Sequence, residues 1–156
     1  IHSSGLFILV SDKERIPGSI LITELAPLPL GVAIPKGIPL SHNTIIRERD
    51  IHNLRLIMSS NLSINPILNS WLGDKAPSMI CDDWELTQNI MESGGGVSIV
   101  PLELKKRATT FFTVIPMLPL VSVKLKLVYK SLSEMSPVEK AFARYTRKVA
   151  SENYKF

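Results

Sequence analysis

The sequence predicts an α/β protein with a largely parallel sheet. Short continuous apolar runs, such as Leu6–Val10, are typical of strands buried on both faces. Segments with helical spacing alternate with these runs, and glycine or proline stands between them. The chain has 156 residues, of which 45% are hydrophobic and 21% charged, so we expect one ordinary globular domain or two small lobes.

The first half of the chain is expected to hold strands and one short helix. Ile20–Thr23 and Leu30–Ile34 read as separate strands, because Pro27 and Pro29 stand between them. Arg55–Met58 is a further strand and leads into a polar cluster. In the segment SINPILNSWL we expect a helix that is N-capped by Ser63. Its apolar face would consist of Ile64, Ile67, Leu68 and Leu72.

The second half alternates more regularly. A strand is expected at Ser78–Cys81, and DDWELTQNIMESG follows as a helix. Asp82 and Glu85 have the spacing of a capping box, and Gly94 suits the left-handed end of a helix. The helical spacing of the apolar residues is carried by Leu86, Ile90 and Met91.

Three strands and a final helix complete the predicted order. The strands are Val97–Val100, Phe111–Ile115 and the alternating segment VSVKLKLVY, whose Lys124 and Lys126 would form a solvent-exposed face. The helix starts with Ser136, Pro137 and Glu139, which match a capping box with proline at the first helical position. Its apolar stripe would contain Val138, Phe142, Tyr145 and Val149.

No catalytic constellation stands out, so we predict that the chain is not an enzyme and needs no cofactor or metal. Gly94–Gly96 follow a helix and precede a strand, the reverse of a phosphate-binding loop, and indicate a tight turn. The three histidines lack metal-ligand spacing. Cys81 is the single cysteine, so no internal disulfide can form, and a small buried hydrophobic role is favoured over a nucleophile.

The net charge of +4 arises from basic residues that are scattered along the sequence. We interpret them as solvated surface rather than a nucleic-acid face, because aromatic residues do not interleave with them. The apolar runs are too short to span a membrane, and no signal peptide is recognisable. A cytoplasmic location is expected.

Polar residues at the ends of two apolar strands suggest a binding site. Ser11 follows Leu6–Val10, and a second group follows Arg55–Met58 at a helix start. Ligands of open α/β sheets sit beyond such strand ends, and hydroxyls with free helix N–H groups would suit an anion. Helix capping and turn formation explain the same residues equally well. The second group contains Ser59, Ser60, Asn61 and Ser63.

Five segments, read in order, resemble the effector-binding domain of LysR-type transcriptional regulators. These are GLFILV, LGVAIPKGIPLS, RERDIHNLRLIMSS, CDDWELTQNIMESGGGVSIVP and LKLVYKSLSEMSPVEKAFARYTRKV, of which the fourth is the most specific. The chain departs from the family pattern at Ile38, where the family has histidine, and at Gly5, where it has an acid.

The resemblance implies a periplasmic-binding-protein-like (type 2) fold with two lobes, of which one is complete here. Residues 1–15 would hold the end of the first lobe and a crossover, 16–108 the second lobe, and 109–156 the other crossover and the rest of the first lobe. The family's winged helix-turn-helix and the start of the first lobe are not among these residues, so we expect a fragment.

The resemblance also implies a ligand-sensing function. A small effector would bind between the lobes at Ser11, Ser59, Ser60, Asn61, Ser63, Val100 and Pro101. Expected partners are this effector, for which the hydroxyl-rich site suits an anion, and further copies of the chain. DNA would be contacted only through the missing N-terminal domain of the parent protein, and no membrane is expected.

Three alternatives remain open from the sequence. A periplasmic solute-binding protein shares the fold but normally carries a signal peptide. An enzyme of similar architecture, prephenate-dehydratase-like or hydroxymethylbilane-type, would need charged catalytic groups at the strand ends. A structural fragment without remaining activity is the third.

Overall fold

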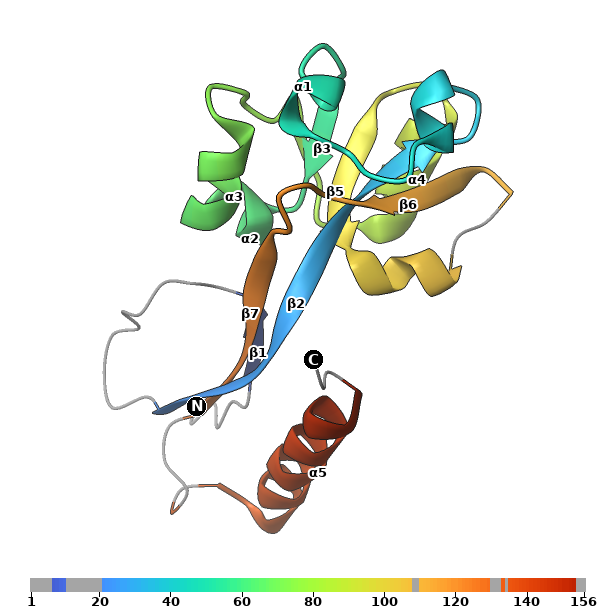
Figure 1. Cartoon of the computed structure of the whole chain (residues 1–156). Helices are drawn as coiled ribbons and strands as arrows, with labels where there is room; N and C mark the ends of the chain where they lie inside the picture. Colours follow the sequence, from blue (N-terminus) through green and yellow to red (C-terminus); the bar gives the residue numbers. More distant parts are fainter. Residues whose placement is uncertain (1–6, 11–20, 108–109, 130–132, 134, 154–156) are drawn as a thin grey trace. The chain divides into compact units, whose positions relative to one another are not determined.

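The computed structural model describes residues 7–10, 21–107, 110–129, 133 and 135–153 (Figure 1). The chain divides into two compact units. The smaller unit combines Ile1–Pro27 with Val123–Phe156, and the larger unit is Leu28–Ser122.

The larger unit is built on a mixed sheet. Its strands lie in the order β6–β2–β5–β3–β4. β3 runs parallel to β4 and β5, whereas β2 is antiparallel to both β5 and β6. The prediction of a largely parallel sheet is therefore wrong outside these three strands. The strands span Leu21–Pro35 (β2), Leu56–Met58 (β3), Met79–Ile80 (β4), Val97–Pro101 (β5) and Phe112–Pro116 (β6).

Short helices connect these strands. α2 and α3 lead from β3 to β4, and α4 leads from β4 to β5, so the three parallel strands are joined by helical crossovers as the sequence pattern indicates. The helical segments are η1 (Pro39–His42), α1 (Glu48–Ile51), α2 (Ser60–Ser63), α3 (Pro66–Leu72), α4 (Trp84–Glu92) and η2 (Leu102–Arg107).

One core cluster joins β2, β3, β5, β6 and α4. Its buried members include Ala33, Ile57 and Met91, and Trp84 packs edge-on against Phe112 with ring centroids 5.6 Å apart. Cys81 is partly buried against the same cluster, in keeping with its predicted role as a small hydrophobic residue.

Strand β2 is continuous, although two separate strands were predicted. Pro27 and Pro29 lie within it and do not end it, because the fixed φ of proline is compatible with extended backbone and only a donor is lost. The next residue donates normally, since the Leu30 N–H bonds the Val121 carbonyl at 2.8 Å.

Two helix caps differ from those predicted. Asp83, not Asp82, caps α4 by accepting from the Leu86 N–H at 2.8 Å. The SINPILNSWL segment does not form one helix capped by Ser63. Asn65 instead caps α3 by accepting from the Leu68 N–H at 3.0 Å, while a separate turn, α2, precedes it.

The exposed faces of these helices also differ from the prediction. Leu68 and Leu72 are buried, but Ile64 and Ile67 are about half exposed. In α4, Met91 is buried whereas Leu86 is exposed. Ile64 lies outside α3, because that helix begins only after its N-cap Asn65.

The glycine-rich turn after α4 agrees with the prediction. Gly94 has φ +79° and Gly96 has φ +141°, conformations that residues with side chains rarely adopt. A Cβ atom on Gly96 would lie 2.3 Å from the Arg55 carbonyl oxygen. The turn therefore brings the start of β5 against the residue before β3.

The smaller unit contains β1 (Phe7–Val10), most of β7 (Ser122–Tyr129) and α5 (Pro137–Asn153). β1 pairs antiparallel with β7. The predicted capping box of α5 is confirmed, because the Ser136 N–H donates to Glu139 Oε2 at 2.7 Å and the Glu139 N–H donates to Ser136 Oγ at 3.3 Å.

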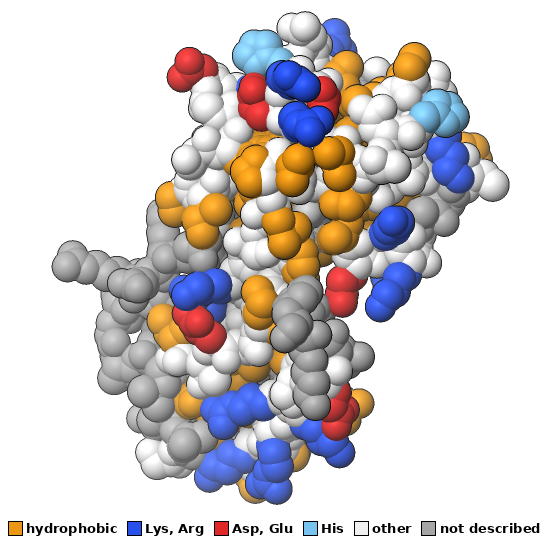
Figure 2. Space-filling view, viewed as in Figure 1, with side chains coloured by type: hydrophobic (Ala, Val, Ile, Leu, Met, Phe, Trp, Pro, Cys, Tyr) orange, Lys and Arg blue, Asp and Glu red, His pale blue; other side chains and the backbone are white. Residues whose placement is uncertain are grey.

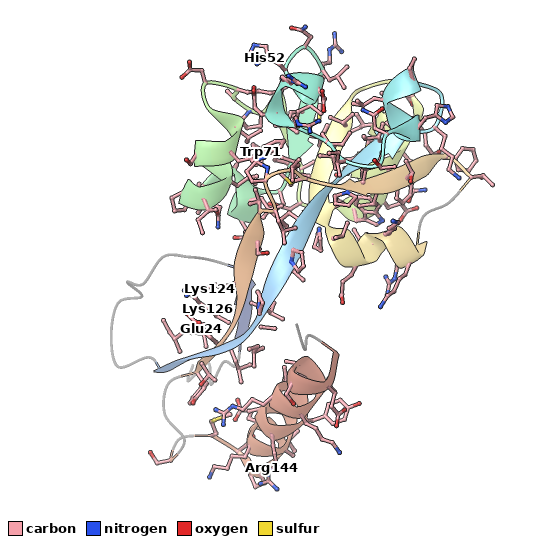
Figure 3. All side chains as sticks on the ribbon, in the orientation of Figure 1. Glu24, His52, Trp71, Lys124, Lys126 and Arg144 are labelled. Carbon is pink, nitrogen blue, oxygen red and sulfur yellow. The ribbon has the colours of Figure 1, made fainter. Side chains whose placement is uncertain are left out.

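Two predictions for this unit are wrong. Lys124 is exposed and bonds Glu24 at 2.8 Å (Figure 3), but Lys126 is only 5% exposed, so β7 does not have one fully wet face. In α5 the buried residues are Ala143 and Ala150. The predicted stripe is instead largely exposed, at 78% for Val138, 47% for Phe142 and 67% for Tyr145.

The helix buries its alanines because they let it approach the strand closely. Ala143 joins a cluster with Leu127, Tyr129 and Met135, and Leu25 packs against it. A small side chain at this contact leaves room for the larger residues of β7.

Replacing Gly96 with alanine should destabilise the larger unit by about 2–4 kcal/mol, because the methyl group would meet the Arg55 carbonyl at a strained φ. Gly94→Ala should lower the free energy of unfolding by about 1–2 kcal/mol, because of its positive φ alone. Gly37→Ala should change it by no more than about 0.5 kcal/mol, because a Cβ atom there would lie in open space. Urea unfolding measures the three values. Equal losses for Gly96→Ala and Gly37→Ala would contradict the close approach.

The capping box should make the stability of α5 depend on pH. Hydrogen bonds from the Ser136 backbone and side chain hold the pKa of Glu139 below its usual range. Its contribution is therefore fully present above the ordinary glutamate pKa of about 4.3 and is lost as pH falls through the lowered pKa. Glu139→Gln should remove this dependence in thermal melts followed by circular dichroism. If the melting temperatures of the wild type and of Glu139→Gln fall in parallel as the pH is lowered, the capping carboxylate does not contribute this stability.

Candidate functional site

The carboxyl ends of the parallel strands β3, β4 and β5 gather the polar residues of the larger unit. Ser59 follows β3, Asp82 follows β4, and Pro101 ends β5. Because these strands are parallel, their carboxyl ends lie at one edge of the sheet, which is where open α/β sheets bind ligands.

A pocket of about 360 Å³ opens at this edge. Its walls combine hydroxyls, one carboxylate and one guanidinium with apolar side chains, the mixture expected of a small-molecule site. The lining residues are Ser59, Leu62, Cys81, Asp82, Trp84, Thr87, Ser98, Ile99, Val100, Pro101, Leu104 and Arg107.

Asp82 is held at the start of α2 by two hydrogen bonds. Its Oδ1 accepts from the Ser60 N–H at 2.7 Å and from the Ser60 hydroxyl at 3.0 Å. A carboxylate is favourable at this end of a helix, because the first N–H groups have no partner within the helix. The position that the sequence suggests for an external anion is therefore already taken by a carboxylate of the chain.

The neighbouring serines also have partners within the chain. Ser59 Oγ caps α2 by accepting from the Leu62 N–H at 3.4 Å, and the Ser63 hydroxyl donates to the Ser60 carbonyl at 2.8 Å. The capping explanation for these serines thus holds. Ser59 can still serve a ligand, because a hydroxyl that accepts one bond retains its own proton for donation.

The residues predicted to bind the effector lie in different places. Ser59, Val100 and Pro101 line the pocket. Ser60 contacts the lining residue Asp82. Asn61 and Ser63 lie on α2 but are not among the lining residues, and Ser11 falls outside the described residues.

The sequence reasoning missed several polar residues of the pocket. Ser98 and Thr87 are buried. Ser98 stands within an apolar strand, and Thr87 lies on the core side of α4. A polar residue at such a position, where the pattern expects an apolar one, is a signal from which the sequence could have identified pocket residues. Arg107 is exposed at the end of η2 and was assigned to the solvated basic surface. No local pattern distinguishes it from Lys105 and Lys106.

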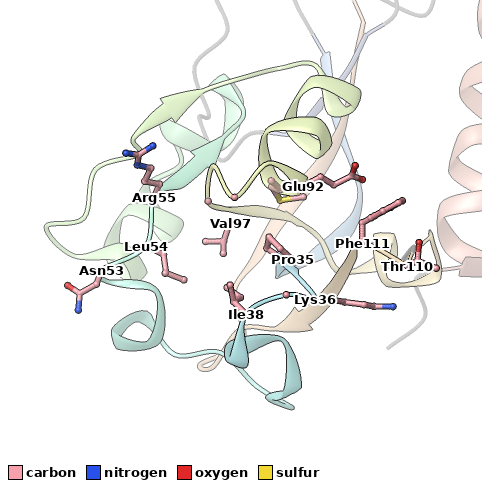
Figure 4. A pocket seen from close by; sticks show the side chains of 14 residues that line it. Pro35, Lys36, Ile38, Asn53, Leu54, Arg55, Glu92, Val97, Thr110 and Phe111 are labelled. Carbon is pink, nitrogen blue, oxygen red and sulfur yellow. The ribbon is translucent and has the colours of Figure 1, made fainter.

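A second, larger pocket of about 570 Å³ lies at the opposite ends of the strands (Figure 4). Arg55 precedes β3 and Gly96 precedes β5, so this pocket is at their amino ends. In Figure 4 the charged ends of Arg55 and Glu92 point away from its apolar middle around Val97. It therefore lacks the convergent polar groups of the smaller pocket.

The described residues offer neither a cluster of metal ligands nor a membrane-spanning helix. They contain no group of three or more histidine, cysteine, aspartate or glutamate side chains placed to hold a metal ion. None of the helices they form has the length and apolar character needed to cross a membrane.

Comparison with known proteins identifies relatives. Residues 7–151 match the family model described as LysR substrate binding domain. No protein in the comparison with curated sequences matches the chain.

Solved structures share its fold at low sequence identity. HinK, a LysR family transcriptional regulator from Pseudomonas aeruginosa, has a TM-score of 0.74 and 16% identity, and the match covers 93% of this chain. That match covers 53% of HinK, so the chain spans about half the length of this regulator.

Two isolated ligand-binding domains are also similar. The effector binding domain of QuiR in complex with shikimate has a TM-score of 0.76 and 18% identity, covering 96% of this chain and 73% of QuiR's. The CcmR regulatory domain of Synechocystis PCC6803 in complex with 2-PG has a TM-score of 0.73 and 15% identity, covering 95% and 72%. These likenesses establish the type 2 periplasmic-binding-protein-like fold.

Asp82→Ala should destabilise the larger unit by about 1–2 kcal/mol, because the first N–H of α2 and the Ser60 hydroxyl both lose their acceptor. Asp74→Ala, a matched exposed aspartate in the loop after α3, should change stability by less than about 0.5 kcal/mol. The midpoints of urea unfolding test the difference. If both variants unfold alike, Asp82 does not anchor α2.

Proposed function

The chain belongs to the LysR substrate binding domain family, and we propose that its larger unit binds a small effector in the pocket between Ser59, Asp82 and Arg107. The observation that carries this proposal is the gathering of polar groups at the carboxyl ends of three parallel strands, above an apolar floor. The pocket volume of about 360 Å³ suits a molecule of metabolite size.

The chemistry of the walls favours a hydroxycarboxylate. Arg107 offers a fork of N–H donors that matches a carboxylate. Asp82 is a hydrogen-bond acceptor and would repel a second carboxylate, so it suits a ligand hydroxyl. Ser59 and Ser98 add hydroxyls, while Leu62 and Val100 cover the carbon skeleton. Shikimate, bound by the structurally similar QuiR domain, has this combination of groups and supports the class.

Effector binding would act on the parent regulator through linkage. A ligand shifts an equilibrium only by the difference between its affinities for two states. We infer that the effector stabilises one arrangement of this domain, and that oligomers of the parent protein convert this preference into altered DNA binding by a separate domain. In this role the chain binds its ligand without chemically changing it.

The proposal predicts that a hydroxycarboxylate stabilises the chain. Ligand at 100 times its Kd should add about 2.7 kcal/mol to the free energy of unfolding, which raises Tm by several degrees. Thermal melts against shikimate, other hydroxycarboxylates and matched acids without hydroxyls measure the effect. Arg107→Gln should abolish the rise and Asp82→Asn should weaken it, whereas Lys105→Gln, on the same η2 segment, should leave it intact.

The controls separate binding from folding. Arg107 and Lys105 are both exposed, so neither substitution should lower Tm in the absence of ligand by more than about one or two degrees. A ligand-induced rise that survives Arg107→Gln would place the effector elsewhere. A cooperative melt with no rise for any hydroxycarboxylate would reject this ligand class.

A further inference from the structure

We propose that the smaller unit carries a second binding site, which takes a phosphate-class oxyanion and is independent of the effector pocket. The site is a pocket of about 440 Å³ beside α5, lined by Ser133, Lys140, Ala143, Arg144 and Arg147. Of the five described residues that line it, three are cationic and none is acidic.

The three cations share one face of the helix. Lys140, Arg144 and Arg147 are spaced by four and three residues, so their side chains are neighbours along successive turns. Figure 2 shows blue side chains gathered over the region where Figure 1 draws α5, and Figure 3 labels Arg144 on that helix. Three of the basic residues that the sequence indicates as solvated surface thus form one cluster on the folded helix.

Arg147 is fixed in position by β-strand residues. Its Nη2 donates to Tyr129 Oη at 3.0 Å and to Thr23 Oγ1 at 3.4 Å. Its guanidinium carbon also lies 5.9 Å from the centre of the Tyr129 ring, within the range of a cation–π contact. These contacts use one nitrogen, so the other donors of a held guanidinium stay available to an anion.

The positive charges of the pocket have no acidic partner among the residues that the structure describes. Within the described residues, no acidic side chain forms an ion pair with Lys140, Arg144 or Arg147, whereas Lys148 of the same helix pairs with Glu152 at 4.0 Å. Like charges one turn apart destabilise a helix. A bound anion would remove this repulsion and add charge-assisted hydrogen bonds.

The hydrogen-bond donors of the pocket indicate which class of anion it would bind. A tetrahedral oxyanion can accept from two guanidinium groups and an ammonium at once, because its oxygens point in different directions. The described lining residues include no aromatic side chain that could stack on bases, and the exposed Phe142 and Tyr145 of the same helix are not among them. Inorganic phosphate, or the phosphate group of a small metabolite, therefore fits better than a nucleic acid.

Isothermal titration calorimetry of the whole chain with inorganic phosphate, at fixed ionic strength, tests the site. We expect saturable binding that Lys140→Gln/Arg144→Gln weakens about tenfold or more, since hydrogen bonds between charged groups are lost. Lys148→Gln removes a charge from the same helix outside the pocket and should leave the affinity within about twofold. Arg107→Gln should also leave it unchanged, which separates this site from the effector pocket.

Three results would overturn the proposal. The first is an absence of saturable phosphate binding by the wild-type chain at millimolar concentration. The second is an equal loss of affinity in Lys148→Gln and in the double variant, which would indicate a general charge effect. A DNA duplex that binds through Lys140 and Arg144 while phosphate does not compete would likewise overturn the phosphate assignment. Arg147 is left unchanged because its contacts with Tyr129 also support the fold.

Discussion

The larger unit depends on the hydrogen bonding of the buried half of strand β2. Leu30, Val32 and Ile34 are fully buried, so their backbone groups need partners within the chain. Strands β5 and β6 pair with this segment on either side, and the Val121 carbonyl accepts from the Leu30 N–H. Gly31 allows the close approach, because a Cβ there would lie 2.9 Å from the Ile115 carbonyl oxygen. The register that pairs Leu30 with Pro101 fixes the end of β5, and with it one wall of the pocket. A shift by one residue would exchange the faces of β5.

The candidate site shows that helix capping and ligand binding draw on the same residue types. Asp82 satisfies the start of α2 and also lines the pocket, so the chain itself supplies the anion that the free N–H groups of a short helix attract. This occupancy changes the expected ligand. A simple anion would be repelled by the Asp82 carboxylate or would have to displace it. A hydroxycarboxylate can instead bond to Asp82 through its hydroxyl group and to Arg107 through its carboxylate.

Helix α5 carries different kinds of residue on its different faces. Small alanines at 143 and 150 are buried, basic residues line a pocket, and the largest apolar residues, Val138 and Tyr145, are exposed. Hydrophobic periodicity selects the largest apolar stripe as the buried face, and here that choice is wrong. Burial is decided by which face fits the partner, and here Ala143 packs in a cluster with Leu127 and Tyr129 of β7.

The sequence by itself determined the α/β class, the family and most strand positions. It also determined the capping box at Ser136 and the turn at Gly94, because these rest on contacts within a few residues. Only the tertiary structure decided the mixed strand directions, the bond from Ser60 to Asp82 across 22 positions and the contact of Arg147 with Thr23 across 124. Of the candidate pocket, the sequence identified Ser59, Val100 and Pro101 but not Arg107. Such pairings depend on strand order and helix orientation, and local patterns carry no information about which distant residue will complete them.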